Sequence, residues 1–290
     1  MTLFNRILIL FCLISCSHAV AHQDDVRVLL RKPLVLFDGN EEGRTHFLSD
    51  YTVRANFGSY FATDEFHSWR FGLGFDKGVL SFSDRAVWRF GLNLDTIADS
   101  DNSIGFRIAQ THYEVFSAIE FKIDESVAYV GYRHRCRHAA DGTDARIIMK
   151  SGPEIGYNSL YHLGAVDLLW ANSAIVYVYG QNDDLTHQPR VNVSSSAQVE
   201  MPITREISLF AGVGMSAIWV TEGTSRHFDL LTPVEATEFR FSPGASLGVN
   251  LKGMLGDVKA YLAYNSNLDA GFRSRAQRTH MISINGEVWY

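Results

Sequence analysis

A period-two alternation of apolar and polar side chains is the feature of this sequence that most constrains its fold. In residues 190–201 the polar set begins with Arg190, Asn192 and Ser194. The opposite face is Val191, Val193, Ser195, Ala197, Val199 and Met201, all apolar except Ser195. Residues 207–219, 244–251 and 258–265 alternate in the same way. Successive side chains of a β-strand point to opposite faces of the sheet, so each stretch predicts a strand with one apolar and one polar face.

Two all-β architectures use such strands, a soluble sandwich and a membrane barrel. Here the polar faces consist of Ser, Gly, Asn and Gln with scattered charges, which suits a wet or hydrogen-bonded lumen. Aromatic residues stand near strand ends, where membrane interfaces would require them. These are Trp69, Trp88, Trp170, Trp219, Tyr264 and Trp289. The sequence therefore predicts an all-β, antiparallel transmembrane β-barrel of about twelve strands, with ten or fourteen as alternatives.

The N-terminal segment has the three parts of a secretory signal peptide: a basic residue, an apolar stretch and an A-x-A end. They are Arg6, residues 7–14 and Ala19-Val20-Ala21. We expect residues 1–21 to be a signal peptide, residues 22–45 a periplasmic lead-in or plug, and residues 46–290 the barrel. A competing interpretation is a lipoprotein, because Leu13-Ile14-Ser15-Cys16 resembles a lipobox that would leave Cys16 lipidated.

The C-terminal strand carries an assembly signal by its pattern. His280, Ile282, Ile284, Gly286, Val288 and Tyr290 share one face. A terminal strand that ends on an aromatic residue resembles the signal by which the barrel assembly machinery of Gram-negative bacteria recognises its substrates. This resemblance implies an outer-membrane location, with outer-membrane lipids and that machinery as partners.

Composition excludes some functions and leaves others open. The 290-residue chain has a formal net charge of −6 and no basic runs, so nothing supports nucleic-acid binding. Beyond residue 21 the single cysteine is Cys136, which excludes an internal disulfide. No cofactor is predicted. The leading hypothesis is an integral outer-membrane barrel with a structural, binding or pore-like role and an unknown ligand.

Residues 130–142 hold the densest chemistry in the chain. Arg133, Arg135 and Arg137 share one strand face and are predicted to be lumen charges balanced by carboxylates. A turn at residues 124–126 would bring Glu114 level with Arg135 or Arg137.

The opposite face of the same strand carries His134, Cys136 and His138. Polar groups that point toward lipid are costly unless they lie at the interface or serve a function. The stretch resembles outer-membrane phospholipase A and the lipid A 3-O-deacylase barrel, which present a His-x-Ser pair on the outer wall. The resemblance implies a lipid-acting acyl-ester hydrolase with His134 as base and Cys136 as nucleophile. The sequence departs from it in having Cys for Ser, and Arg137 follows where Asn is usual.

Other readings of this face remain open. Tyr132, His134, Cys136, His138 and Asp141 also fit the Tyr-x-His-x-Ser-x-His-x-x-Asp spacing of a group of uncharacterised outer-membrane barrels, with Cys for Ser. Glu114, His138 and Asp141 are candidates for orienting or binding roles. The two histidines, Cys136 and Asp141 are metal ligands by residue type, but alternate strand residues diverge by roughly 6.6 Å per pair, so no metal site is predicted. A structural or interfacial role is the third possibility.

Overall fold

The computed structural model describes residues 45–47, 51–62, 68–82, 85–99, 107–139, 147–182, 188–269 and 277–290. The predicted signal peptide, the Cys16 lipobox and the predicted lead-in, except its last residue Thr45, lie outside these ranges. In the described part every regular element is a β-strand. No helix there is long and apolar enough to cross a membrane.

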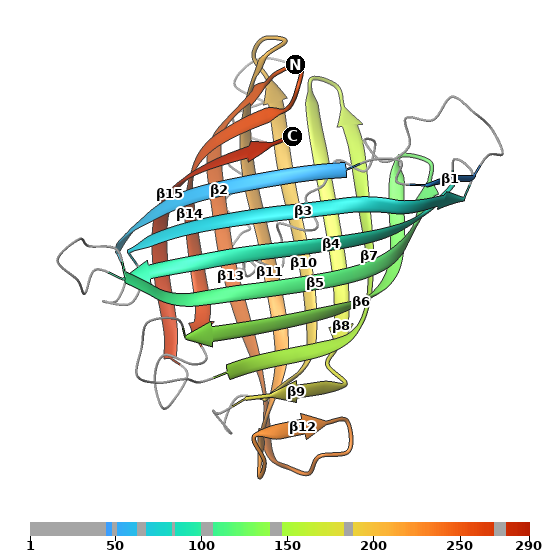
Figure 1. Ribbon diagram of the computed structural model, residues 1–290. Helices are drawn as coiled ribbons and strands as arrows, with labels where there is room; N and C mark the ends of the chain where they lie inside the picture. The colour runs from blue at the N-terminus through green and yellow to red at the C-terminus, as the bar shows by residue number, and fades with distance from the viewer. Residues whose placement is uncertain are drawn as a thin grey trace.

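Twelve antiparallel strands form a closed barrel (Figure 1). They are β2 (Tyr51–Ala62), β3 (Trp69–Phe82), β4 (Ala86–Asp99), β5 (Arg107–Ile123), β6 (Ser126–Ala139), β7 (Ile147–Leu163), β8 (Val166–Val176), β10 (Gln188–Pro202), β11 (Ile207–Gly223), β13 (Val234–Lys252), β14 (Asp257–Asp269) and β15 (Gln277–Trp289). The last strand pairs with the first, with Val288 opposite Ala55, and this pairing leaves no free edge. The predicted all-β barrel and its twelve strands are confirmed.

The alternation in the sequence separates the lumen from the outer wall. On β10, Asn192 is 3% exposed and faces inward, whereas Val193 is 51% exposed and faces outward. Trp88, Trp170 and Trp219 are exposed on the outside, as the girdle prediction requires. Trp289 is different, because its ring lies on the lumen side beneath the guanidinium of Arg54, 5.4 Å from its centroid.

Short turns mark one end of the barrel. Asp124 and Glu125 join β5 to β6, and Gly164 and Ala165 join β7 to β8. Asp124 and Gly164 adopt positive φ values of 52° and 69°, as two-residue hairpin turns require at their first central position. In outer-membrane barrels the short turns lie on the periplasmic side. Residues 130–139 run from the middle of β6 toward the other, extracellular end.

Three short strands supplement the barrel: β1 (Thr45–Phe47), β9 (Tyr179–Gln181) and β12 (His227–Asp229). Strand β9 continues from β8 after a break at residues 177–178 and pairs with β7, and β12 pairs with β9. A Cβ on Gly152 would lie 1.8 Å from the carbonyl oxygen of Val176, so only glycine allows the two backbones to approach this closely. Strand β9 is therefore held against the extracellular end of β7.

Candidate functional site

The lumen side of β6 is bound into an ion-pair network. Arg133 is 5% exposed and lies between Glu114 of β5, at 2.6 Å, and Glu154 of β7, at 2.5 Å. Arg135 pairs with the same Glu114 at 2.8 Å and stands directly opposite it in the register. The hydroxyl of Tyr129 donates to Glu154 at 2.9 Å. Glu114 thus lies level with Arg135, at the position expected from the short turn, whereas Glu154 was not anticipated.

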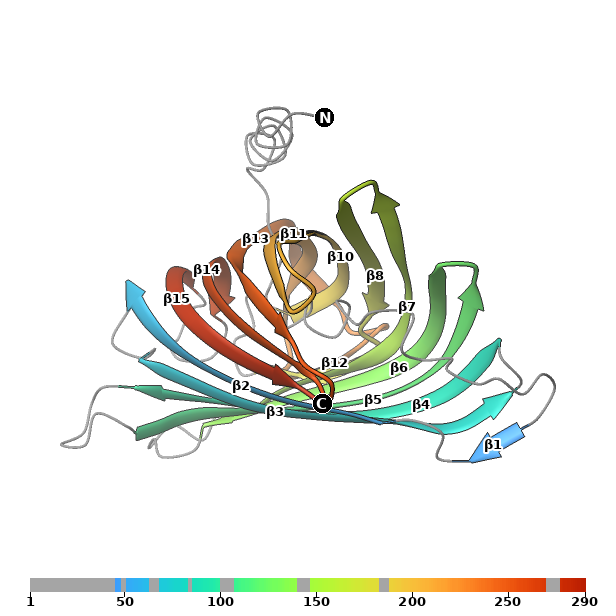
Figure 2. The same ribbon diagram turned by 90° about the horizontal axis from the view of Figure 1, so that it is seen from above.

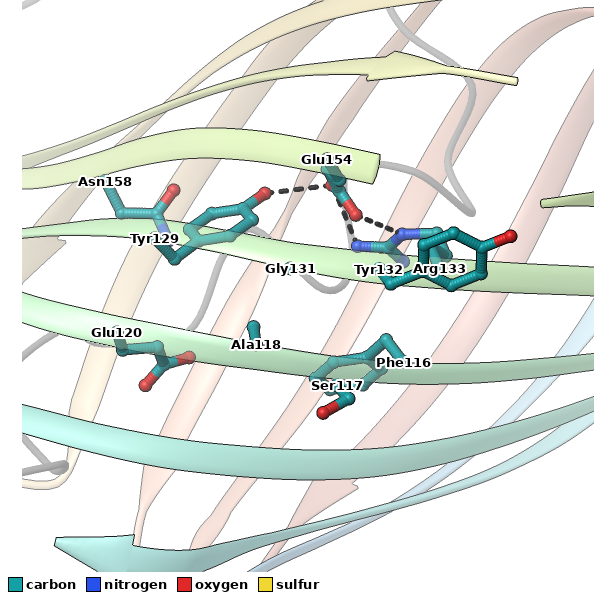
Figure 3. Close-up of a pocket in the computed structure, with 10 residues that line it drawn as sticks. All are labelled: Phe116, Ser117, Ala118, Glu120, Tyr129, Gly131, Tyr132, Arg133, Glu154 and Asn158. Atoms are coloured by element: carbon teal, nitrogen blue, oxygen red, sulfur yellow. Dashed lines mark hydrogen bonds and ion pairs between the residues drawn. The ribbon is translucent and has the colours of Figure 1, made fainter. Parts of the chain in front are cut away.

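A pocket beside this network is shown in Figure 3. Phe116, Tyr129, Arg133, Glu154 and Asn158 contribute to its lining. The two carboxylates bound to Arg133 already neutralise its guanidinium, so the pocket offers little positive charge to an anionic ligand. We interpret these lumen charges as structural. Arg137, on the same face of β6, stands opposite His112 of β5.

The outward face of β6 places a thiol beside an imidazole. Sγ of Cys136 lies 2.6 Å from Nε2 of His138, two residues further along the strand. Both side chains are half-buried. The ring of Tyr113 on β5 meets the His138 ring edge-on, with 5.6 Å between the centroids. A thiol in hydrogen-bond contact with a base is the arrangement that nucleophilic catalysis by cysteine requires.

The second histidine of this face has a different partner from the one expected. Nδ1 of His134 lies 2.7 Å from Oγ of Ser151 on β7, its direct neighbour in the register. Ser151 is 5% exposed. The resemblance implies His134 as the base for Cys136, whereas the contact that the structure shows for the thiol is with His138. Ser151 was missed, although a serine at an outward position of β7 between Met149 and Pro153 is a polar interruption in a lipid-facing row.

Asp141, a metal site and Tyr290 are the remaining candidates from the sequence. Asp141 lies outside the described residues. Among the residues that the structure describes, no three His, Cys, Asp or Glu side chains are grouped so that they could hold a metal ion. Tyr290 follows β15 at the periplasmic end, where its backbone N–H donates to the carbonyl oxygen of Val53 at 2.9 Å.

Comparisons with known proteins give likenesses of fold. No protein-family model matches the chain, and no curated protein matches it in sequence. An outer membrane channel from Pseudomonas putida F1 superimposes with a TM-score of 0.48 and 12% identity, covering 88% of this chain and 98% of the other. LpxR from Salmonella typhimurium superimposes with a TM-score of 0.47 and 8% identity, covering 82% of this chain and 99% of the other. Outer membrane phospholipase A from Escherichia coli superimposes with a TM-score of 0.44 and 10% identity, covering 83% of this chain and 92% of the other.

The wall chemistry settles the environment of the barrel. A closed barrel satisfies all its backbone hydrogen bonds internally, and its outward residues are mostly large and apolar, such as Phe71, Leu73 and Ile155. This protein is an integral outer-membrane β-barrel. Its outward-facing groups, Cys136 and the two histidines included, are therefore presented to a lipid environment.

Proposed function

We propose that this barrel is an acyl-ester hydrolase that acts on membrane lipids, with Cys136 as nucleophile and His138 as general base. The observation that carries the proposal is the 2.6 Å contact between the thiol and Nε2 of His138 on the outer wall. Polar groups on a lipid-facing surface are costly unless they lie at the interface or serve a function, and a hydrogen-bonded thiol–imidazole pair has the chemistry to serve one.

The reaction follows from the pair. Nε2 of His138 accepts the thiol proton as the sulfur attacks the ester carbonyl carbon. The protonated imidazole then gives that proton to the leaving alcohol oxygen, which leaves an acyl thioester on Cys136. Water, deprotonated by the same His138, attacks the thioester and releases a fatty acid and the free thiol. Substrates reach the pair laterally, because the pair lies on the wall and not in the lumen.

The order of the two residues distinguishes this site from the enzymes that its sequence resembles. In outer-membrane phospholipase A and the lipid A 3-O-deacylase barrel the base precedes the nucleophile, in a His-x-Ser pair. Here the contact joins Cys136 to the histidine that follows it. A strand presents residues at i−2 and i+2 on the same face, so either order is geometrically permitted.

We also propose that the chain is related to the barrels with the Tyr-x-His-x-Ser/Cys-x-His-x-x-Asp stretch. In support, Tyr132, His134, Cys136 and His138 all occupy outward positions on β6. Asp141, three residues after His138, is then the candidate carboxylate for orienting the base. For assembly, we propose that the barrel assembly machinery recognises β15 with its terminal Tyr290.

The experiment is fatty-acid release by the folded full-length protein in detergent, from phospholipid and from lipopolysaccharide. We expect Cys136→Ala and His138→Ala to abolish release and Cys136→Ser to retain part of it, since a hydroxyl can replace the thiol as nucleophile. His280→Gln, at another outward histidine far from β6, is the matched control and should behave as the wild type. Absence of release by a wild-type barrel that shows the heat-dependent gel mobility of folded barrels would refute the proposal.

A further inference from the structure

The outward face of β6 holds a second histidine that the thiol–imidazole pair does not use. His134 is half-buried, and its Nδ1 is engaged by the hydroxyl of Ser151 at 2.7 Å. Cys136 stands between His134 and His138 on this face, so the nucleophile is flanked by an imidazole on either side along the strand. Only one of the two, His138, touches the sulfur.

The backbone beneath His134 is paired on both sides. Ser151 pairs with His134 across β6–β7 and with Tyr179 across β7–β9. The N–H of Val178 donates to the carbonyl oxygen of Ser151 at 2.9 Å. Because Gly152 lets the β8–β9 backbone approach closely, the backbone that carries Ser151 is fixed from both sides. A buried hydroxyl on so constrained a backbone holds the ring that it contacts in one orientation.

The contact permits two tautomers, and the one in which Ser151 donates to Nδ1 is the one that leaves Nε2 of His134 as an N–H donor. When the Ser151 hydroxyl donates to Nδ1, the neutral imidazole bears its hydrogen on Nε2. His134 then presents an N–H donor on the face that carries the nucleophile. Attack on an ester places negative charge on the former carbonyl oxygen, and a fixed N–H donor aimed at that oxygen lowers the barrier. His138 holds the thiol proton at that moment, so a separate donor has to serve the oxygen.

We propose that His134 is a second catalytic residue, which donates its Nε2 hydrogen to the oxyanion, and that Ser151 is the positioning residue that fixes its tautomer and orientation. No proton leaves His134 in this step, because it acts by hydrogen bonding alone. The inference rests on the proposed function, since it assigns a role within the same acyl-transfer site. His138 then acts as the general base, and His134 acts as the hydrogen-bond donor to the oxyanion.

The test measures kcat and KM separately on a short-chain chromogenic acyl ester, with full-length protein folded in detergent. His134→Ala should lower kcat about 100-fold with little change in KM, as loss of an oxyanion donor does. His134→Gln, whose amide N–H reaches the region of Nε2, should lose less activity than His134→Ala. Ser151→Ala should lower kcat by about 10-fold through misplacement of the ring, and Ser151→Thr, which keeps the hydroxyl, should restore it.

A matched control exists on another part of the wall. The Tyr264 hydroxyl lies 2.8 Å from Nδ1 of His280, so Tyr264→Phe removes an equivalent hydroxyl–imidazole contact away from the site and should leave kcat unchanged. Wild-type kcat in Ser151→Ala and His134→Ala, with Cys136→Ala inactive, would overturn this inference while the proposed function stood. An inactive wild type with a folded barrel would overturn both. Equal losses in Ser151→Thr and Ser151→Ala would show that Ser151 is a packing residue only, and would overturn its positioning role.

Discussion

Strands β3–β7 and β10–β13 form facing walls of the barrel (Figure 2). Long charged side chains are buried along the lumen side of β3–β7, whereas the middle of β10–β13 buries mainly small polar ones. Arg89, which is fully buried, lies 2.8 Å from Asp76 and 3.0 Å from Glu120. The facing wall presents instead Ser194, Ser196, Ser208, Gly212, Gly214, Ser216, Ser242, Gly244 and Asn250.

The two walls differ in the free energy lost when a buried polar group loses its partner. A buried guanidinium is tolerable only while each of its carboxylate partners remains, because an uncompensated buried charge costs far more than an unpaired hydroxyl. The small-residue wall tolerates imperfection, and the hydroxyls of Ser196, Ser208 and Ser242 are buried without a hydrogen-bond partner. We therefore expect stability to depend sharply on single residues of the charged wall and weakly on those of the other.

The largest effect should come from Arg133→Met. The change leaves Glu114 and Glu154 facing each other without the cation that joins them. We expect a loss of about 3–5 kcal/mol in the free energy of unfolding, as for other broken buried ion pairs. Urea unfolding of the barrel in lipid vesicles, followed by tryptophan fluorescence, measures it.

Neutralising Glu154 is the control for that variant. Arg133→Met combined with Glu154→Gln should recover part of the stability, since Glu114 keeps Arg135 as its partner and the second carboxylate is no longer charged. A loss below about 1 kcal/mol in the single variant would show that water reaches the network, as at an exposed ion pair, and the contrast between the walls would fail.

A smaller difference in stability is expected between alanine substitutions of two glycines, one on each wall. A Cβ on Gly72 would lie 2.3 Å from both Asn56 Nδ2 and Asp95 Oδ1, and Asp95 is held by Arg70 at 3.0 Å. On Gly212 the nearest atom is the hydroxyl of Ser246, at 2.7 Å, which can rotate away. We expect Gly72→Ala to cost about 1–3 kcal/mol by overpacking, and Gly212→Ala under about 1 kcal/mol. Similar costs in the same urea titration would mean that both walls are equally packed.

The sequence was sufficient for the features that depend on local pattern. Alternation on β10 and β11 defined both faces, because side-chain direction in a strand follows from position alone. The turn predicted at residues 124–126 brought Glu114 level with Arg135 or Arg137, and the structure shows a two-residue turn that places it opposite Arg135. Glu154 could not be placed in this way, because β7 follows β6 through residues 140–146, and a connection of that length does not set a register.

The candidate site shows the same limit at the level of side chains. The pattern put His134, Cys136 and His138 on one face, but parity cannot tell which imidazole touches the thiol, since that depends on rotamers. Ser151 and the strand β9 behind it come from later parts of the chain. Their contacts arise only when the barrel brings β7 beside β6. A single outward serine in β7 was the one local sign available.

The smallest effect should come from a hydroxyl pair on the small-residue wall. Oγ of Ser194 and Oγ of Ser216 lie 2.7 Å apart, and both residues are at most 1% exposed. Ser194→Ala leaves the Ser216 hydroxyl buried without this partner and should cost about 1 kcal/mol. Ser194→Ala with Ser216→Ala removes both hydroxyls together and should be closer to wild type than the single variant, because an apolar pair needs no partner. A double variant less stable than the single one in the urea titration would show that these hydroxyls belong to a wider network. The small-residue wall would then depend on complete pairing just as the charged wall does, and the difference between them would be one of composition alone.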